Sequence, residues 1–93
     1  MSKKKKFSKK VVQDSINLYV AHARWVLPRL KYLRKHGYGY PGYMSVKEWE
    51  AVLDDMIRGF KIIAKDEINN DEQDRKALVA INLLATHYYA LWD

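Results

Sequence analysis

Side chains suited to binding an anionic ring recur every three or four residues between positions 22 and 36. They are Trp25, Arg29, Tyr32 and His36, with His22 beside them. In a helix this spacing places the side chains on one face. A guanidinium between aromatic rings can pair with a phosphate while the rings stack on a base. The pattern therefore predicts a ligand-binding face for a nucleotide-type small molecule.

The segment after this face, residues 36–44, is rich in tyrosine and glycine. Tyr38, Tyr40 and Tyr43 alternate there with three glycines and Pro41. Glycine and proline at this density exclude a helix and predict a loop. We include the three tyrosines in the predicted ligand-binding set because the loop could fold over a ligand held by the preceding helix.

Both aromatic clusters of the chain also have a structural explanation. A helix in a small bundle is often apolar on two faces, so Trp25 and Tyr32 could pack against another helix instead of binding a ligand. Near the C-terminus, Tyr88, Tyr89 and Trp92 exceed what one helix face can bury in a thin core. They either seal the end of the bundle or form a subunit interface.

Catalytic and metal sites find little support in the sequence. The three histidines lack the spacing of metal ligands, and there is no cysteine. The stretch 69–74 lacks the glycine and the distal glutamate of a calcium loop, and so indicates a helix cap. The adjacent pair Asp54 and Asp55 diverges on a helix. We predict a protein that is not an enzyme, with no catalytic residue, metal or cofactor.

Charge divides the chain into a tail and a body. Residues 1–10 contain six lysines and no acid, and predict a disordered basic tail. Residues 11–93 form a single helical domain, basic up to position 47 and acidic after it. No apolar run could span a membrane, and no signal-peptide core follows the lysines, so we expect a cytoplasmic protein.

Apolar residues at helical spacing predict an all-α fold, a small three-helix bundle. The first helix runs from about Ser15 to Lys35, and Pro28 predicts either a kink in it or a break that would divide it and give four segments. The second helix starts at a capping box formed by Ser45 and Glu48. Asn69 or Asn70 caps the third helix.

Individual residues of the second and third helices allow sharper expectations. Gly59 in the middle of the second helix indicates that another backbone crosses close to it. In the third helix, the stripe that includes Leu78 and Ile81 should face the core.

A combination of short motifs lies between positions 19 and 60. These are Leu27-Pro28-Arg29-Leu30-Lys31, Tyr40-Pro41-Gly42, Ser45 with Glu48-Trp49, Leu53-Asp54, Met56-Ile57 and Phe60. Over this range the chain resembles small uncharacterised proteins encoded by tailed bacteriophages. The resemblance implies an accessory phage gene expressed in a bacterial cytoplasm, with no assigned activity. By analogy, such genes often counter host defence, some by sequestering nucleotide signals.

Three functions remain open at this point. The first is a homo-oligomeric phage binding protein that captures an anionic nucleotide-type ligand through the residues above. The second is a protein–protein inhibitor that covers a host enzyme with exposed aromatic side chains. The third is weak nucleic-acid binding through the lysine tail, which would be sensitive to salt.

Overall fold

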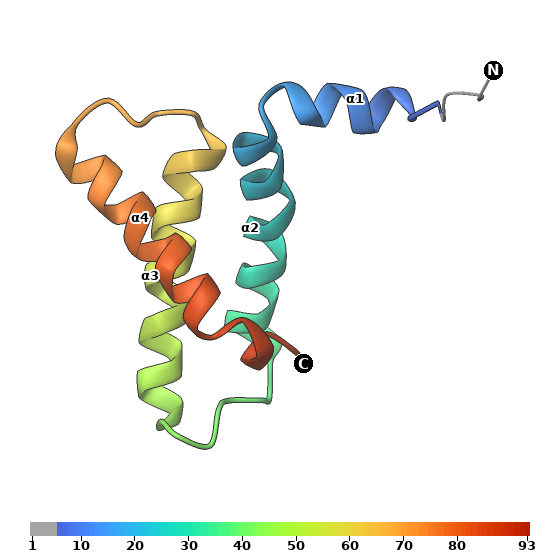
Figure 1. Ribbon diagram of the computed structural model, residues 1–93. Helices are drawn as coiled ribbons and strands as arrows, with labels where there is room; N and C mark the ends of the chain where they lie inside the picture. Colours follow the sequence, from blue (N-terminus) through green and yellow to red (C-terminus); the bar gives the residue numbers. More distant parts are fainter. Residues whose placement is uncertain (1–5) are drawn as a thin grey trace.

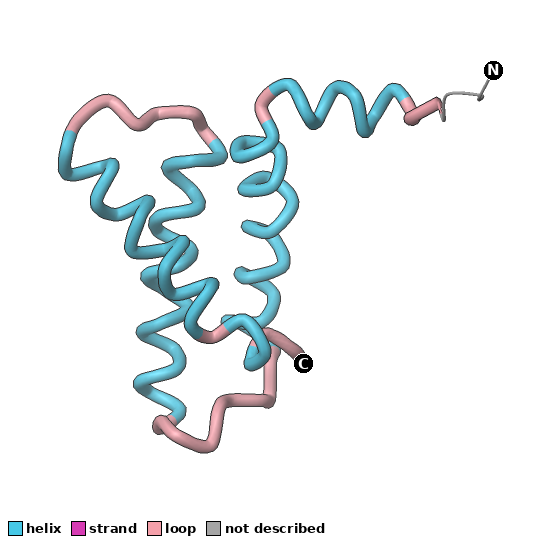
Figure 2. Tube along the Cα trace, viewed as in Figure 1, coloured by secondary structure: helices cyan, strands magenta, loops and turns pink. Residues whose placement is uncertain are grey.

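The chain folds into helices joined by short loops. The computed structural model describes residues 6–93 and assigns no strand within that range. The elements are α1 (Lys9–Ile16), α2 (Leu18–His36), α3 (Val46–Ala64), α4 (Asp71–Thr86) and the 3-10 turn η1 (Tyr88–Ala90) (Figures 1 and 2). The predicted all-α class is confirmed. Within residues 6–93 there are four α-helices instead of the predicted three, because α1, built mostly from residues before the expected start at Ser15, precedes α2.

The first helix begins earlier than its sequence pattern suggested. The Ser8 hydroxyl accepts a hydrogen bond from the Val11 N–H at 3.2 Å, so α1 starts at Lys9 instead of near Ser15. Lys9 and Lys10, expected in the tail, therefore lie in its first turn. Residues 1–5 of the expected tail lie outside the described residues.

The division between α1 and α2 falls at Asn17, and of the two alternatives at Pro28, a kink or a break, the break does not occur. Asn17 has φ −135° and ψ 67°, far from helical values. Pro28 lies inside α2 and leaves the Arg24 carbonyl without the Pro28 N–H as a partner. The helix continues because its core-facing residues Val26 and Leu30, on either side of Pro28, are both buried.

α3 is the central helix of the body. The predicted capping box at its start is confirmed: the Glu48 N–H donates to Ser45 Oγ at 3.1 Å, and the Ser45 N–H donates to Glu48 Oε1 at 2.8 Å. Trp49, Leu53, Met56, Phe60 and Ile63 follow at helical spacing and are all buried. They form the middle of one core that α2 covers on one side and α4 on the other.

α4 lies very close to α3, as the glycine at position 59 predicted. A Cβ atom at Gly59 would collide with the Ala80 side chain and the Lys76 carbonyl. Ala77 and Ala80 are accordingly the buried residues of α4, whereas Leu78 and Ile81 stay half-exposed. The expected inward orientation of Leu78 and Ile81 is therefore wrong. Small residues allow the closest helix contact, and this leaves Leu78 and Ile81 outside it, whereas Leu83 and Leu84 pack partly buried against the core.

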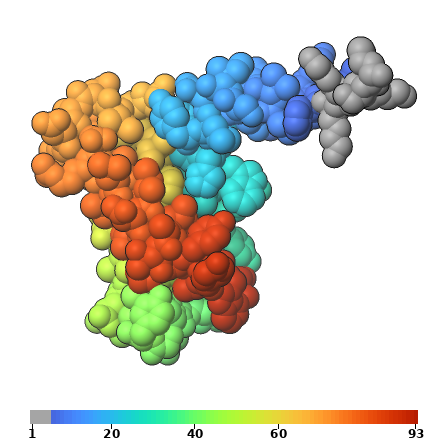
Figure 3. All heavy atoms as spheres, in the orientation of Figure 1, coloured from blue at the N-terminus to red at the C-terminus, as the bar shows by residue number. Residues whose placement is uncertain are grey.

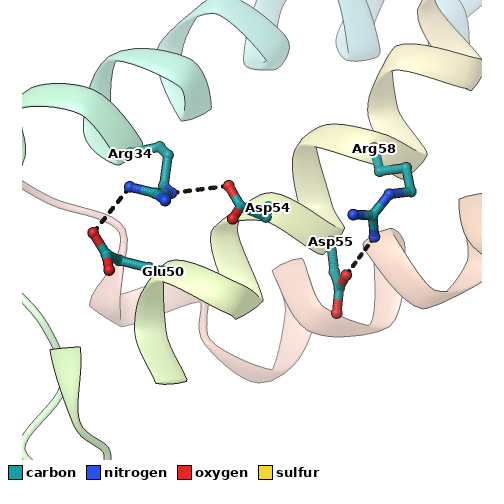
Figure 4. Close-up of polar contacts among 5 residues, drawn as sticks. All are labelled: Arg34, Glu50, Asp54, Asp55 and Arg58. Atoms are coloured by element: carbon teal, nitrogen blue, oxygen red, sulfur yellow. Dashed lines mark hydrogen bonds and ion pairs between the residues drawn. The ribbon is translucent and has the colours of Figure 1, made fainter. Parts of the chain in front are cut away.

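Ion pairs reinforce the contact between α2 and α3. Arg34 on α2 donates to Glu50 Oε2 at 2.9 Å and to Asp54 Oδ1 at 2.8 Å, both on α3 (Figure 4). The hydrogen bond to Asp54 is the main cause that raises the pKa of Arg34. Asp55 pairs instead with Arg58 of its own helix (Figure 4).

α1 extends away from the body like an arm, at the end of the molecule where the loop between α3 and α4 also lies (Figures 1 and 3). The loop 37–45 lies at the opposite end, close to the C-terminal segment (Figure 2). Between residues 6 and 93, no helix combines the length and apolar character needed to cross a membrane.

Candidate ligand-binding groove

A groove of about 490 Å³ separates α2 from the C-terminal segment. We call it the aromatic groove. In Figure 3 the red C-terminal segment lies against the surface of α2. The groove is lined by His22, Trp25, Val26, Arg29, Leu30 and Leu33 of α2, and by Leu84, Tyr88, Tyr89, Leu91 and Trp92 from the end of the chain.

The end of α4 places the second wall of this groove. His87 leaves helical geometry with φ −110° and ψ 22°, and its N–H donates to the Leu83 carbonyl at 3.0 Å. The chain then turns through η1 toward α2. Trp92 comes to rest on the loop backbone, where a Cβ atom added at Gly39 would lie 3.7 Å from the indole ring.

Trp25 and Arg29 form the polar edge of the opposite wall. The guanidinium carbon of Arg29 lies 4.1 Å from the centroid of the Trp25 ring, and one of its nitrogens donates to the Trp25 carbonyl at 2.7 Å. These contacts fix the cation over the indole. A guanidinium has five N–H donors, so several remain for an anion in the groove.

The two rings of the predicted face are surface groups. Trp25 is 58% exposed and Tyr32 is 54% exposed, so neither belongs to the core. His22 lies next to Trp25 on this face, and its ring makes an edge contact with Phe60 of α3, with centroids 5.9 Å apart. The part of the groove that His22 lines is therefore in direct contact with the core through Phe60.

The structure brings together only part of the predicted face. Trp25 and Arg29 line the aromatic groove, and His22 joins them. Tyr32 and His36 pair with each other further along α2, with ring centroids 5.0 Å apart, and do not line it. The four-residue stripe predicted from helical spacing is therefore divided between two locations.

The tyrosine loop contributes to a neighbouring hollow instead. Tyr40 and Tyr43 line this second space of about 480 Å³, which shares Tyr89 and Trp92 with the aromatic groove. Tyr43 is fixed by a 2.8 Å hydrogen bond between its hydroxyl and His87 Nδ1. Tyr38 is almost completely exposed and lines neither space.

Sequence reasoning did not connect the C-terminal aromatic residues with the face on α2. Tyr88, Tyr89 and Trp92 lie about sixty positions away in the chain, and no short motif joins them to Trp25. The signal in the sequence for a surface role was that three large aromatic residues so close together exceed what a thin core can bury. Tyr89, with 95% of its surface exposed, is the clearest case.

Comparisons with known proteins add no family assignment. The chain matches no protein-family model, no curated protein and no solved structure. Across residues 6–93, no three His, Asp or Glu side chains gather as a possible metal site.

Proposed function

We propose that this protein binds a small anionic molecule with a planar ring, of nucleotide type, in the aromatic groove and does so without catalysing a reaction. One observation carries the proposal. The Arg29 guanidinium, held over Trp25, faces a groove whose far wall is built from Tyr88, Tyr89 and Trp92.

The chemistry of the groove matches such a ligand. Aromatic side chains provide stacking surfaces for a base, worth about 1–3 kcal/mol each. Arg29 supplies the cation for a phosphate or carboxylate group. The volume of about 490 Å³ falls within the range common for small-molecule sites.

The proposed setting is a bacteriophage accessory protein acting in the host cytoplasm. Its support is the resemblance to small phage proteins that the motifs between positions 19 and 60 suggest. In this setting α2, α3 and α4 serve as a three-helix scaffold, and capture of a nucleotide signal would counter a host defence. Homo-oligomerisation is part of the same proposal, because the exposed aromatic surface is large for a monomer.

A second candidate is a protein–protein inhibitor. Tyr38 and Tyr89 favour it, since both rings are almost completely exposed and flat aromatic surfaces are common in protein interfaces. This candidate predicts loss of partner binding on substitution of Tyr38, a residue outside the aromatic groove.

Calorimetric titration with AMP, ATP and cyclic di-AMP tests ligand binding. We expect the parent protein to bind at least one of these probes, and Arg29→Ala to remove most of the affinity by deleting the cation. Trp25→Ala should weaken binding by about 1–3 kcal/mol, the contribution of one stacking surface. Neither change should lower the melting temperature much, because both side chains are exposed.

Two matched variants separate the groove from the rest of the surface. Arg58→Ala removes an arginine of α3 that pairs with Asp55, outside the groove. Tyr32→Ala removes a ring from the same helix face as Trp25 that does not line the groove. Both controls should bind as the parent does. Equal binding by all four variants, or no binding of any probe by the parent, would contradict the proposal.

A further inference from the structure

The arm formed by α1 presents its apolar side away from the body. Lys10, Gln13 and Asp14 on its polar side share a hollow with the outer face of α2. Val11, Val12 and Ile16 point elsewhere and are exposed, Ile16 to 78%. An amphipathic helix normally buries its apolar side against another part of a protein. In this orientation the apolar side of α1 has no such contact.

The arm is also too short to be stable without such a contact. Isolated helices below about 12–15 residues are marginal in water, and α1 has only 8. Its connection to α2 consists of Asn17 alone, whereas antiparallel helices need a loop of about 2–5 residues. α1 therefore cannot fold back against the face of its own α2.

A cleft that could accept an amphipathic helix lies between α2 and α4. Both helices belong to the described part of the chain, and no Cα atom of one comes within 8 Å of the other. The space of about 300 Å³ has Phe60 and Ile63 of α3 as its floor, and Leu78 and Ile81 of α4 as one wall. We call it the apolar cleft. It contains the large α4 side chains that the close α3–α4 contact turns outward.

Charge complementarity identifies the occupant. Asp74 lines the apolar cleft, and the segment 66–74 next to it contains five acidic residues and no basic one. The arm carries Lys9 and Lys10 in its first turn, preceded by Lys6. Lys10 is paired with Asp14 on the polar side of the arm, at 3.1 Å, which leaves Lys6 and Lys9 as the cations that could approach Asp74 at the cleft.

We propose that two copies of this chain form a reciprocal dimer, in which α1 of each copy docks into the apolar cleft of the other. Each exchange covers Val11, Val12 and Ile16 with Leu78 and Ile81 of the partner copy. Because the two contacts are equivalent, the assembly closes as a two-fold dimer. The docking contacts themselves include neither Trp25 nor Arg29, although the polar side of α1 shares its hollow with both residues.

Analytical ultracentrifugation of charge variants tests the dimer. The chain has a mass of 11.0 kDa. At high micromolar concentration the parent should give a sedimentation-derived molar mass of twice that value. Ile16→Asp on the arm and Leu78→Asp in the cleft should each weaken association at least tenfold. Both side chains are half-exposed or more, so circular dichroism should show an intact helical fold.

Matched controls place the same charge on the other side of each helix. Gln13→Asp lies on the polar side of α1, and Val79→Asp lies on α4 in a hollow shared with Arg58. Both should remain dimeric. A monomeric parent, or a dimer that survives Ile16→Asp, would overturn the proposal.

Cross-linking shows which surfaces meet, because the chain contains no natural cysteine. Ile16→Cys protein mixed with Leu78→Cys protein should form the mixed disulfide in excess over either symmetric one. With Val79→Cys in place of Leu78→Cys the mixed product should be lost. Dominance of the symmetric Ile16→Cys product would mean that arms pack on each other, and would overturn docking in the cleft.

Discussion

At the scale of single residues, Gly59 has the largest consequence for the shape of the molecule. Its missing side chain allows the Ala80 side chain and the Lys76 carbonyl of α4 to lie directly on the α3 backbone. The large α4 residues Leu78 and Ile81 are consequently turned away from the core. One glycine thus determines which side of α4 packs against α3 and which side stays exposed.

Gly59→Ala should lower the free energy of unfolding by about 1–3 kcal/mol, because overpacking at the helix contact outweighs the higher helix propensity of alanine. Chemical denaturation followed by circular dichroism measures this change. Gly42→Ala is the control, because a Cβ atom there meets nothing within 4 Å. A Gly59→Ala variant as stable as the parent would mean that α4 does not lie directly on the α3 backbone at this position.

At the scale of elements, α3 has the most complete local signals. Its cap, its buried stripe and its central position agree with one another. In contrast, α2 contains a proline, and Asn17, which precedes its first residue, makes no side-chain cap hydrogen bond. The cap also makes α3 sensitive to pH. The Ser45 backbone N–H, and then its hydroxyl, stabilise the ionised carboxylate and lower the pKa of Glu48.

Ser45→Ala should destabilise the fold by about 0.5–2 kcal/mol through loss of the cap. Because the pKa of Glu48 is lower in the folded state than in the unfolded state, its contribution is present above the unfolded value and is lost as the pH falls through the folded value. The difference in stability between the parent and Glu48→Gln should therefore shrink on acidification.

Thermal unfolding between neutral and acidic pH measures this difference. Glu67→Gln makes the same chemical change in the exposed loop after α3, and should differ little from the parent at any pH. A gap between parent and Glu48→Gln that stays constant across this range would contradict the assignment of the carboxylate to the cap.

At the scale of the whole molecule, the helices form an open arrangement. α3 packs against both α2 and α4, yet α2 and α4 are separated, and the aromatic groove and the apolar cleft both lie in that separation. His22 and Leu84 line both spaces. A ligand and a docked helix would therefore occupy neighbouring parts of one long depression.

Hydrogen exchange should reveal the state of the arm. In dilute protein the amides of residues 12–16 should exchange rapidly, because a short helix without a partner opens easily. At high concentration the docked arm should become protected, while α3 amides exchange slowly in both samples. Exchange of the arm that does not depend on concentration would show that association leaves α1 uncovered.

Much of this protein could be predicted from local sequence because local interactions determine it. The helical class follows from the spacing of apolar residues, and the start of α3 follows from hydrogen bonds within four residues of Ser45. The cap at Asn70 has the same origin. The closeness of another helix at Gly59 could be expected because glycine destabilises the interior of a helix, and a close backbone contact would explain its presence there.

Other features depend on contacts that no local pattern encodes. Pro28 remains inside α2 because Val26 and Leu30 are held in the core on both sides of it, and this stabilisation outweighs one missing hydrogen bond.

The candidate site shows the same division. Helical spacing correctly placed Trp25 and Arg29 side by side, since the repeat of a helix is a local property. Only the tertiary structure brought Tyr88, Tyr89 and Trp92 opposite to them and left Tyr32 outside. The direction in which the chain leaves α4 at His87 decides this arrangement, and the positions of α2 and α4 relative to each other are set by the core and not by any local pattern.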